Sequence, residues 1–256
     1  MNEASARTRV ALFRAADDAR KSAERLATMG FEAVIAPVMA PVGLEPPVPT
    51  GRFDAVAATS AKALDLMAPS LLASLAQTAL YVVGAAGVAA AARRGLGVAG
   101  SAGDARDLAR VVIDALGDKG RVLYLAGADR KPDMENALIR AGFSIEVAEV
   151  YAARALSDWS AEEAHGVASC RAALHFSRRS AELALGLALR AGIEAPWRAM
   201  THVTISVDAA EPFHASGVAV VIAAAPREEA MFTALDIRSQ QDATKGRGSL
   251  PLRALV

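Results

Sequence analysis

Residues 30–38 read GFEAVIAPV and residues 142–150 read GFSIEVAEV, so the chain twice ends a helical stretch at Gly-Phe and continues into a short apolar strand. Each stretch completes a strand–helix–strand pattern. The first strands, RVALF from Arg9 and RVLYL from Arg121, both begin 21 residues before the glycine. Glycine is favoured after a helix because it readily adopts the left-handed backbone conformation. The equal spacing indicates that one strand–helix–strand unit occurs twice.

The segments that follow the two copies also correspond. From Gly84 to Gly95 and from Ser206 to Gly217 the distance is 11 residues in both cases. Strands are expected at 53–59 and 80–83 after the first copy, and at 172–176, 203–205 and 218–223 after the second. Helical stretches separate them, among them 61–72 and the stretch from Ser206 to Gly217. This pattern is typical of open parallel sheets with helices on both faces. The residues therefore predict an α/β fold with two doubly wound parallel sheets. They leave open whether each copy pairs with the strands directly after it or with the distant set.

The composition describes a globular protein with no strong overall charge. The 256 residues are 53% apolar and 22% charged, which is typical of one or two domains with a sizeable core. The 28 basic and 28 acidic residues balance, so charge favours neither nucleic acid nor an anionic membrane as a partner. No stretch reaches the ~18 uncharged apolar residues of a membrane span, and the N-terminal MNEASARTR lacks the apolar core of a signal peptide. We therefore expect a cytoplasmic protein.

Two segments lack the periodicity of helices and strands. Residues 37–49 (PVMAPVGLEPPVP) contain five prolines, which exclude an interior strand or helix and indicate an extended connector. Residues 239–256 (SQQDATKGRGSLPLRALV) are expected to form a flexible basic tail.

The common cofactor and metal motifs are absent or misplaced. The pattern Gly95-x-Gly97-x-x-Gly100 follows a helix instead of a strand, so it does not predict dinucleotide binding. The chain has no phosphate loop of the Gly-Lys-Ser type and no Gly-x-Ser-x-Gly elbow, and its four histidines lack the spacing of metal ligands. The single cysteine, Cys170, allows neither an intramolecular disulfide nor a Cys-based zinc site, and we expect an inert thiol. We therefore predict no cofactor and no metal.

The candidate ligand contacts lie after the expected strands. In open α/β sheets ligands bind beyond the carboxyl ends of the strands, where helix N-termini present unpaired N–H groups. Amides and basic side chains there suit a ligand with several carboxylates. The candidate substrate-binding residues are Arg14, Thr59, Ser60, Ala61, Lys62, Gly84, Gly127, Arg130, Lys131, Ser177, Arg178, Arg179 and Ser206. Some also fit structural roles: Ser60 and Ser177 suit helix N-caps, and Arg178 and Arg179 suit a solvated first turn.

Several short motifs, in this order and spacing, resemble the uroporphyrinogen III synthase family over residues 9–237. They are Arg14 after the first strand, Thr59-Ser60-Ala61, VVG at 82–84, VLYLAGADRKPDMENALIRAGF at 122–143, VY at 150–151, HFSRRSA at 175–181 and Ala225-Pro226. The resemblance implies two interleaved lobes, the first unit packing with the last part of the chain. Lobe 1 would comprise 1–37 and 153–238, lobe 2 41–148, the two bridge strands 36–42 and 149–154, and the tail 239–256.

The chain departs from the family at two turns. Family members often carry Gly-x-x-Thr-Ala there, whereas this chain has GAAGV at 84–88 and SVDAA at 206–210. No threonine hydroxyl is therefore expected to contact a substrate at those turns, while the backbone amides remain.

The resemblance implies a cofactor-independent carbon–oxygen lyase of tetrapyrrole (haem) biosynthesis. Its substrate is hydroxymethylbilane, a linear tetrapyrrole polycarboxylate that loses water and closes into a ring with the last pyrrole inverted. It also implies a monomer and a transient handover of substrate from the preceding pathway enzyme. Two lobes on a flexible bridge would bring the reacting carbons together.

Tyr151 is the candidate catalytic residue, donating a proton or hydrogen bond to the departing hydroxyl, although an anchor of the bridge fits the same position. The alternative functions are a non-catalytic two-lobe protein that binds or senses a small ligand, and an impaired synthase paralogue. A nucleotide-using α/β protein is disfavoured by the missing motifs.

Overall fold

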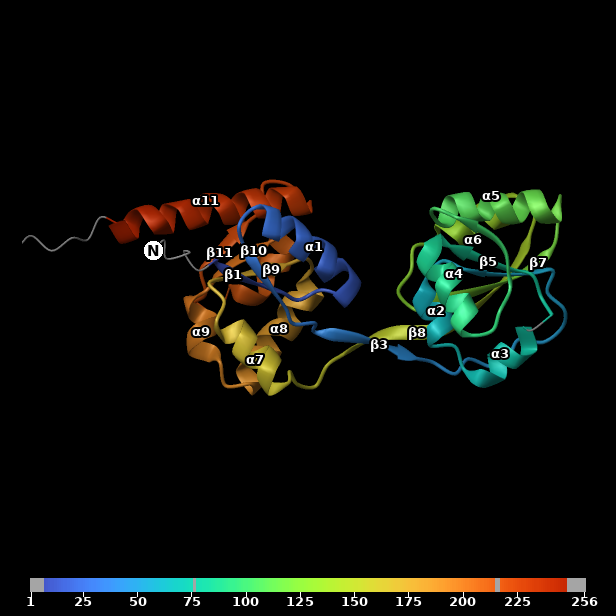
Figure 1. Ribbon diagram of the computed structural model, residues 1–256, viewed down its shortest axis with the longest axis horizontal. Coiled ribbons are helices and arrows are strands. Elements are labelled where there is room, and N and C mark those ends of the chain that lie inside the picture. Colours follow the sequence, from blue (N-terminus) through green and yellow to red (C-terminus); the bar gives the residue numbers. More distant parts are fainter. Residues whose placement is uncertain (1–6, 76, 215–216, 248–256) are drawn as a thin grey trace, which may run out of the picture. The chain divides into compact units, whose positions relative to one another are not determined.

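The structure of the chain is a computed structural model that describes residues 7–75, 77–214 and 217–247. The described residues up to Ala40 and from Ala155 onward form one compact unit, unit 1, and Pro41–Arg154 form the other, unit 2. Unit 1 is thus made from the two ends of the chain and unit 2 from its middle. In Figure 1 the dark blue elements up to residue 40 and the yellow to red elements from residue 155 onward belong to unit 1, and the elements between these residues belong to unit 2.

Unit 1 is built on a parallel sheet. Among the described residues its strand order is β11-β10-β9-β1-β2, and every neighbouring pair is parallel. β9 comes from the last third of the chain, yet it lies beside β1, with Val10 opposite Ala172. The strands are β1 (Arg9–Leu12), β2 (Glu32–Ile35), β9 (Ala172–His175), β10 (Thr201–Thr204) and β11 (Val220–Ile222).

Helices cover both faces of this sheet and bury two apolar clusters (Figure 1). On one face α1 and α11 contribute Leu26 and Phe232. On the other face α7, α8, α9 and the 3-10 helix η1 surround Trp197 and Phe213. α7 begins at a capping box on Ser160, which satisfies amides that a helix N-terminus leaves unpaired. The helices are α1 (Ala16–Thr28), α7 (Ala161–Ala168), α8 (Arg178–Arg190), α9 (Glu194–Ala199), α10 (Val207–Ala210), η1 (Glu211–Phe213) and α11 (Glu228–Arg247).

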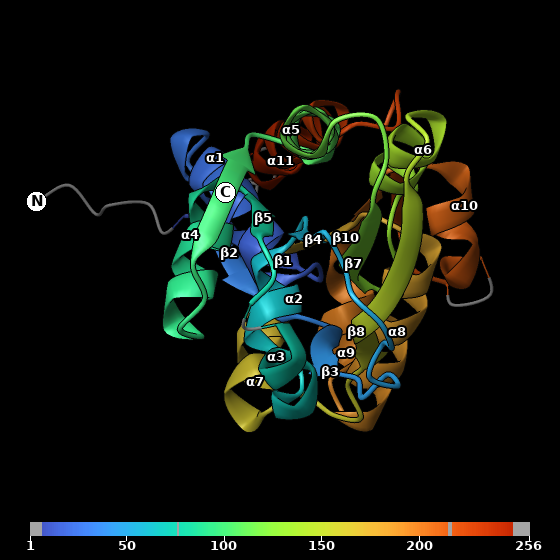
Figure 2. The same cartoon turned by 90° about the vertical axis from the view of Figure 1, so that its right-hand side faces the viewer.

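Unit 2 repeats this design with one more strand. The order is β3-β8-β7-β4-β5-β6, and the pairs from β8 to β6 are parallel. The apolar runs of β4 and β7 are buried on both faces, as expected for central parallel strands. In Figure 2 the long strand β8 runs beside β7. The strands are β3 (Met39–Gly43), β4 (Ala55–Ala58), β5 (Leu80–Val83), β6 (Val98–Ala102), β7 (Arg121–Gly127) and β8 (Ser144–Ala155).

Two layers of helices cover the unit 2 sheet. α2, α3 and α4 bury one face, where Ala90 and Ala91 allow α4 to approach closely. α5 and α6 bury the other face with Leu108 and Leu138. Asp104 caps α5 by accepting hydrogen bonds from two amides of its first turn. The helices are α2 (Ala61–Asp65), α3 (Pro69–Leu75), α4 (Gly84–Arg93), α5 (Ala105–Leu116) and α6 (Asp133–Arg140).

The two chain segments that pass between the units pair with each other. Val38 accepts a backbone hydrogen bond from Leu156 (3.0 Å), and Val150 accepts one from Leu44 (2.8 Å). The numbers rise along one segment as they fall along the other, so the pairing of β3 with β8 is antiparallel. β3 is an edge strand, which tolerates Pro41 although proline has no N–H to donate. The strand within the first quoted stretch is β2, which belongs to the unit 1 sheet, and the first bridge strand is β3, which begins just after that stretch at Met39.

The structure confirms the α/β fold with two interleaved doubly wound sheets. The first copy, β1-α1-β2, shares its sheet with β9, β10 and β11, and the second copy, β7-α6-β8, shares its sheet with β4, β5 and β6. Both sheets therefore have one order, β2-β1-β9-β10-β11 and β8-β7-β4-β5-β6. The residues alone left this pairing open, and the family resemblance supplied it.

Two helices expected from the periodicity are interrupted by proline. The helix expected over 61–72 is the separate pair α2 and α3, because Pro69 has no N–H for the preceding turn. The helix expected between Ser206 and Gly217 is the four-residue α10 followed by η1, which contains Pro212.

The segment that was expected to be a flexible tail is helical from Ser239 as far as Arg247, because α11 continues to that residue. Residues 228–245 contain neither Gly nor Pro, so the backbone offers no reason for the helix to stop earlier. The rest of the expected tail, residues 248–256, lies outside the described residues.

Candidate functional site

The carboxyl ends of the parallel strands meet at one edge of each sheet. Chain order reverses between β1 and β9 in unit 1 and between β7 and β4 in unit 2. Ligands of open α/β sheets bind at such switch points. The predicted substrate-binding residues at the unit 1 edge are Arg14, Ser177, Arg178, Arg179 and Ser206. Those at the unit 2 edge are Thr59, Ser60, Ala61, Lys62, Gly84, Gly127, Arg130 and Lys131. The structure therefore brings the predicted contacts together as two sets, one in each unit.

Arg14 lies at the switch point of unit 1. Its guanidinium carbon is 4.1 Å from the ring centroid of Phe176, which follows β9. Its Nη1 donates to Glu228 Oε1 (2.8 Å) and to the Ser22 hydroxyl (3.0 Å). The side chain of Glu228 is only 18% exposed and that of Arg14 27% exposed, so water screens this ion pair less than a surface pair.

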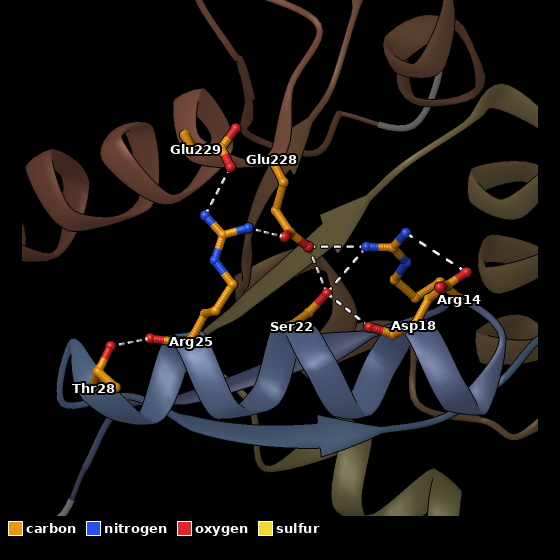
Figure 3. A network of polar contacts seen from close by, with 7 residues as sticks. All are labelled: Arg14, Asp18, Ser22, Arg25, Thr28, Glu228 and Glu229. Carbon is orange, nitrogen blue, oxygen red and sulfur yellow. Dashed lines mark hydrogen bonds and ion pairs between the residues drawn. The ribbon is translucent and has the colours of Figure 1, made fainter. Parts of the chain in front are cut away.

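Glu228 stands at the centre of the polar network in Figure 3. It comes from the N-terminus of α11 and lies between Arg14 and Arg25, and the Ser22 hydroxyl of α1 contacts the same carboxylate. Glu229 accepts a hydrogen bond from Arg25 as well (2.8 Å). The network ties the loop after β1 to α1 and α11. Arg14 is therefore already bound to a carboxylate, and a substrate carboxylate would have to share it.

The serines predicted at the two edges are helix caps. Each accepts a hydrogen bond from a backbone N–H of the first helical turn: Ser60 at 3.3 Å, Ser177 at 3.2 Å and Ser206 at 3.3 Å. This confirms the capping role considered for Ser60 and Ser177. A substrate contact by the same serines stays a prediction.

Arg130, in the loop after β7, is held by two acidic side chains. Its Nε donates to Glu135 Oε1 and its Nη1 to Glu149 Oε1, both at 2.8 Å. A third hydrogen bond goes to the carbonyl of Gly127 (3.2 Å). The hydrogen bond to Glu135 raises the pKa of Arg130, so its charge is permanent but largely balanced. Lys131, the next residue of the loop, is exposed.

The first turn of α8 shows the same pairing. Arg178 Nε donates to Glu182 Oε1 (3.0 Å), and its Nη1 lies 3.6 Å from Asp208 Oδ1 of α10. The hydrogen bond to Glu182 raises the pKa of Arg178. Arg179 is exposed beside it, and Lys62 of α2 is partly buried.

The N-terminus of α4 differs from the capped helices. Its N-cap residue, Val83, makes no side-chain capping hydrogen bond, so Val83 leaves the first amides of α4 uncapped. Gly84 has φ of 68°, in the left-handed region that favours glycine. An added Cβ at Gly84 would meet nothing within 4 Å, so space is free on that side of the turn. This turn therefore suits an anionic group.

Thr59 and Tyr124 join the two strands at the switch point of unit 2. The Thr59 hydroxyl, after β4, lies 2.7 Å from the Tyr124 hydroxyl, on β7. The ring of Tyr124 is 2% exposed and packs in the cluster beneath α5 and α6. Burial raises the pKa of the Tyr124 phenol, so it keeps its proton at neutral pH.

Tyr151 is placed by a β-bulge. Ala126 pairs with Glu149 but Gly127 pairs with Tyr151, so one residue of β8 is extra at this point. The Tyr151 ring then lies against Gly127, where an added Cβ would be 2.6 Å from the ring carbon Cζ. Gly127 is therefore needed for close approach of this ring, a role that the sequence analysis did not assign to it.

A buried histidine pair lies in unit 1. His175 Nε2 is 3.0 Å from His202 Nδ1, and His202 Nε2 is 2.9 Å from the Trp197 carbonyl oxygen. That carbonyl can only accept, so His202 carries its proton on Nε2 and accepts from His175 on Nδ1. His175 Nδ1 then holds no proton, and it has no hydrogen-bond partner among the described residues. Both rings are neutral within a cluster that includes Phe13 and Phe213.

Tyr124 and Glu228 were not found by sequence reasoning. Tyr124 stands in the apolar run RVLYL, and the available signal was its phenol, because a buried tyrosine hydroxyl needs a partner. Glu228 has no comparable signal, since its partners come from the other end of the chain.

The described residues contain neither a candidate metal-binding cluster nor a candidate membrane-spanning helix. No group of three or more His, Cys, Asp or Glu side chains in this part of the chain is placed to hold a metal ion. Likewise, none of the described helices combines the length and the apolar character needed to cross a membrane.

The fold and its edges define an open parallel α/β protein with a candidate anion-binding edge in each unit. The model of the family described as "Uroporphyrinogen-III synthase HemD" matches residues 20–233. The chain therefore belongs to the uroporphyrinogen-III synthase family.

Solved structures from two bacteria are similar to the chain. The uroporphyrinogen-III synthetase of Helicobacter pylori is 17% identical, with a TM-score of 0.49, over 91% of this chain and 100% of that one. A mutant uroporphyrinogen III synthase of Thermus thermophilus is 18% identical, with a TM-score of 0.42, over 93% and 99%. No curated protein sequence matches the chain.

Proposed function

We propose that the protein is a uroporphyrinogen III synthase, which closes hydroxymethylbilane into a ring with loss of water and inversion of the last pyrrole. The family match over residues 20–233 carries this proposal. The reaction belongs to haem biosynthesis and makes the protein a lyase that acts on a linear tetrapyrrole.

The chemistry of the two edges supports a polycarboxylate substrate. The amides at the start of α4 offer donors that the side chain of the N-cap residue, Val83, does not satisfy. The edge arginines keep their charge but are paired with acids, as Arg130 is with Glu135 and Glu149. Amides would therefore bind substrate carboxylates directly, and the paired arginines would chiefly stabilise the edge.

Tyr151 is the proposed donor to the departing hydroxyl. The C–O bond of the hydroxymethyl group breaks, and the hydroxyl leaves as water with a proton from the donor. The methylene carbon then bonds to the substituted carbon of the last pyrrole, and the bond from that carbon to its original methylene bridge breaks. The released bridge carbon bonds to the unsubstituted α carbon of the same pyrrole, which inverts the ring. That α carbon loses its proton to the donor, so the net change is loss of one water. The close packing on Gly127 supports this role because it fixes the position of the phenol.

Turnover tests the proposed function directly. Hydroxymethylbilane is generated in place by the preceding pathway enzyme, the protein is added, and the products are separated by isomer after oxidation. We expect the inverted isomer in excess over the spontaneous, uninverted one. Formation of the uninverted isomer alone would contradict the proposal and leave a two-lobe ligand-binding protein.

The Tyr151→Phe variant tests the proposed donor. We expect kcat to fall about 100-fold, because a positioned proton donor contributes on that scale. Tyr81→Phe is the matched control, since it removes a phenol hydroxyl from β5 of the same unit. Full rate and an unchanged isomer ratio in Tyr151→Phe would remove this residue from the mechanism.

A further inference from the structure

We propose that Tyr124 is a positioning residue, which turns the Thr59 hydroxyl into a hydrogen-bond donor for a substrate carboxylate at the switch point of unit 2. The inference rests on the proposed function for the identity of the substrate. It assigns Tyr124 a role in substrate binding and states in which direction the Thr59 hydroxyl donates its hydrogen bond.

The first step is the direction of the hydrogen bond between the two hydroxyls. Either oxygen of the 2.7 Å contact is able to donate. The Tyr124 ring is 2% exposed, and Thr59 is the hydrogen-bond partner that the described structure gives its hydroxyl. A buried O–H without an acceptor costs free energy, whereas partly exposed Thr59 can use outside partners. Tyr124 therefore donates and Thr59 accepts.

The second step is what this leaves for Thr59. A hydroxyl has one proton and two acceptor positions. With one acceptor position occupied by the Tyr124 proton, the Thr59 proton is directed to another group. Burial also raises the pKa of the Tyr124 phenol, which keeps that phenol a donor. Thr59 is thus prepared to donate, which suits a carboxylate and not a cation.

The third step is the location. Thr59 follows β4 and Tyr124 lies on β7, so the contact spans the two strands at which the order of the sheet reverses. Ligands of such sheets bind at this place. The turns at 84–88 and 206–210 contain no threonine. Thr59 supplies a hydroxyl donor in unit 2 from the neighbouring strand end.

The test is a set of variants with KM and kcat measured separately. We expect Tyr124→Phe to raise KM about 3- to 10-fold with kcat unchanged, as for loss of one oriented hydrogen bond to substrate. Thr59→Val should raise KM at least as much, and Thr59→Ser should keep the wild-type KM. The double variant Tyr124→Phe/Thr59→Val should match Thr59→Val alone, because both changes remove one donor.

Two further measurements separate this role from stability and from the proposed function. Tyr81→Phe is the control, because Tyr81 belongs to the same buried cluster as Tyr124 and should leave KM unchanged. Binding of uroporphyrin III, a ring that bears the same carboxylates, is followed by fluorescence and should weaken by the same factor in Tyr124→Phe. If the wild-type protein shows no turnover, the proposed function is wrong. Uroporphyrin III binding by the wild type and the variants would still test the role of Thr59. Wild-type KM and porphyrin affinity in Tyr124→Phe, or additive effects in the double variant, would overturn the inference.

Discussion

Acid should destabilise unit 1 more than unit 2, because a neutral histidine pair is buried in unit 1 only. Protonated His175 would place an N–H at its Nδ1, which has no hydrogen-bond partner among the described residues. Protonated His202 would direct an N–H at the N–H of His175. Burial lowers the pKa of His175 well below its usual value and lowers the pKa of His202 to about 4.

The sign and size of the effect follow from these directions. The unfolded chain takes up protons at histidine below a pH of about 6.5, while the folded unit does not, so stability is complete above that pH and falls below it. For His202 the loss continues until its folded pKa of about 4. Between pH 7 and pH 5 it amounts to about 2 kcal/mol, and a similar loss at His175 brings the total to about 4 kcal/mol. That is a large part of a typical domain's stability of about 5–15 kcal/mol.

Tryptophan fluorescence reports on the unfolding of unit 1. Both tryptophans of the chain, Trp159 and Trp197, lie in the buried cluster around this pair. Urea unfolding followed by this signal should give a free energy of unfolding about 4 kcal/mol lower at pH 5 than at pH 7. The loss should persist in the control His165→Gln/His214→Gln, which removes the two exposed histidines. A change of less than about 1 kcal/mol, or its disappearance in the control, would refute the buried-pair explanation.

Two further variants test contacts described above. Gly127→Ala should lower kcat by up to about 100-fold, because its Cβ would displace the Tyr151 ring, whereas Gly103→Ala, where an added Cβ meets nothing within 4 Å, should be active. Wild-type kcat in the first variant would show that the ring position does not matter. Glu228→Gln should destabilise unit 1 by about 2 kcal/mol in urea unfolding because it removes the partly buried carboxylate charge that Arg14 and Arg25 share. The exposed Glu229→Gln should change much less, and equal losses would contradict the central place of Glu228 in Figure 3.

The fold was predictable where the sequence repeats. The 21-residue spacing from Arg9 to Gly30 and from Arg121 to Gly142 located β1-α1-β2 and β7-α6-β8 in advance. Which strands share a sheet was not readable from the residues, because β1 pairs with β9 through contacts between distant parts of the chain. The two interrupted helices have a local cause. The apolar periodicity continues through Pro69 and Pro212, but a proline cannot continue the backbone hydrogen bonds of a helix.

The location of the candidate site was predictable from the sequence, but the hydrogen-bond partners of its side chains were less so. Strand ends fix where Thr59 and Arg14 lie, since parallel strands share one carboxyl edge. The sequence could not show that Arg14 is occupied by Glu228, or that Thr59 is oriented by Tyr124, because both partners come from distant segments. The bulge that turns Tyr151 over Gly127 is likewise a matter of register, which a single sequence does not reveal.

The interleaving of the chain sets the order in which the units can be completed during translation. Unit 2 is one continuous segment, Pro41–Arg154, so all of its strands have been made before the last third of the chain exists. β1 must wait for β9, because Val10 pairs with Ala172. At about 5–20 residues per second this delay lasts roughly 10–30 s, during which the edge of β1 is unpaired. In a nascent chain of this protein, unit 2 can therefore fold while β1 still lacks its partner β9. Chaperones that recognise open strand edges should act on the N-terminal segment of such a chain.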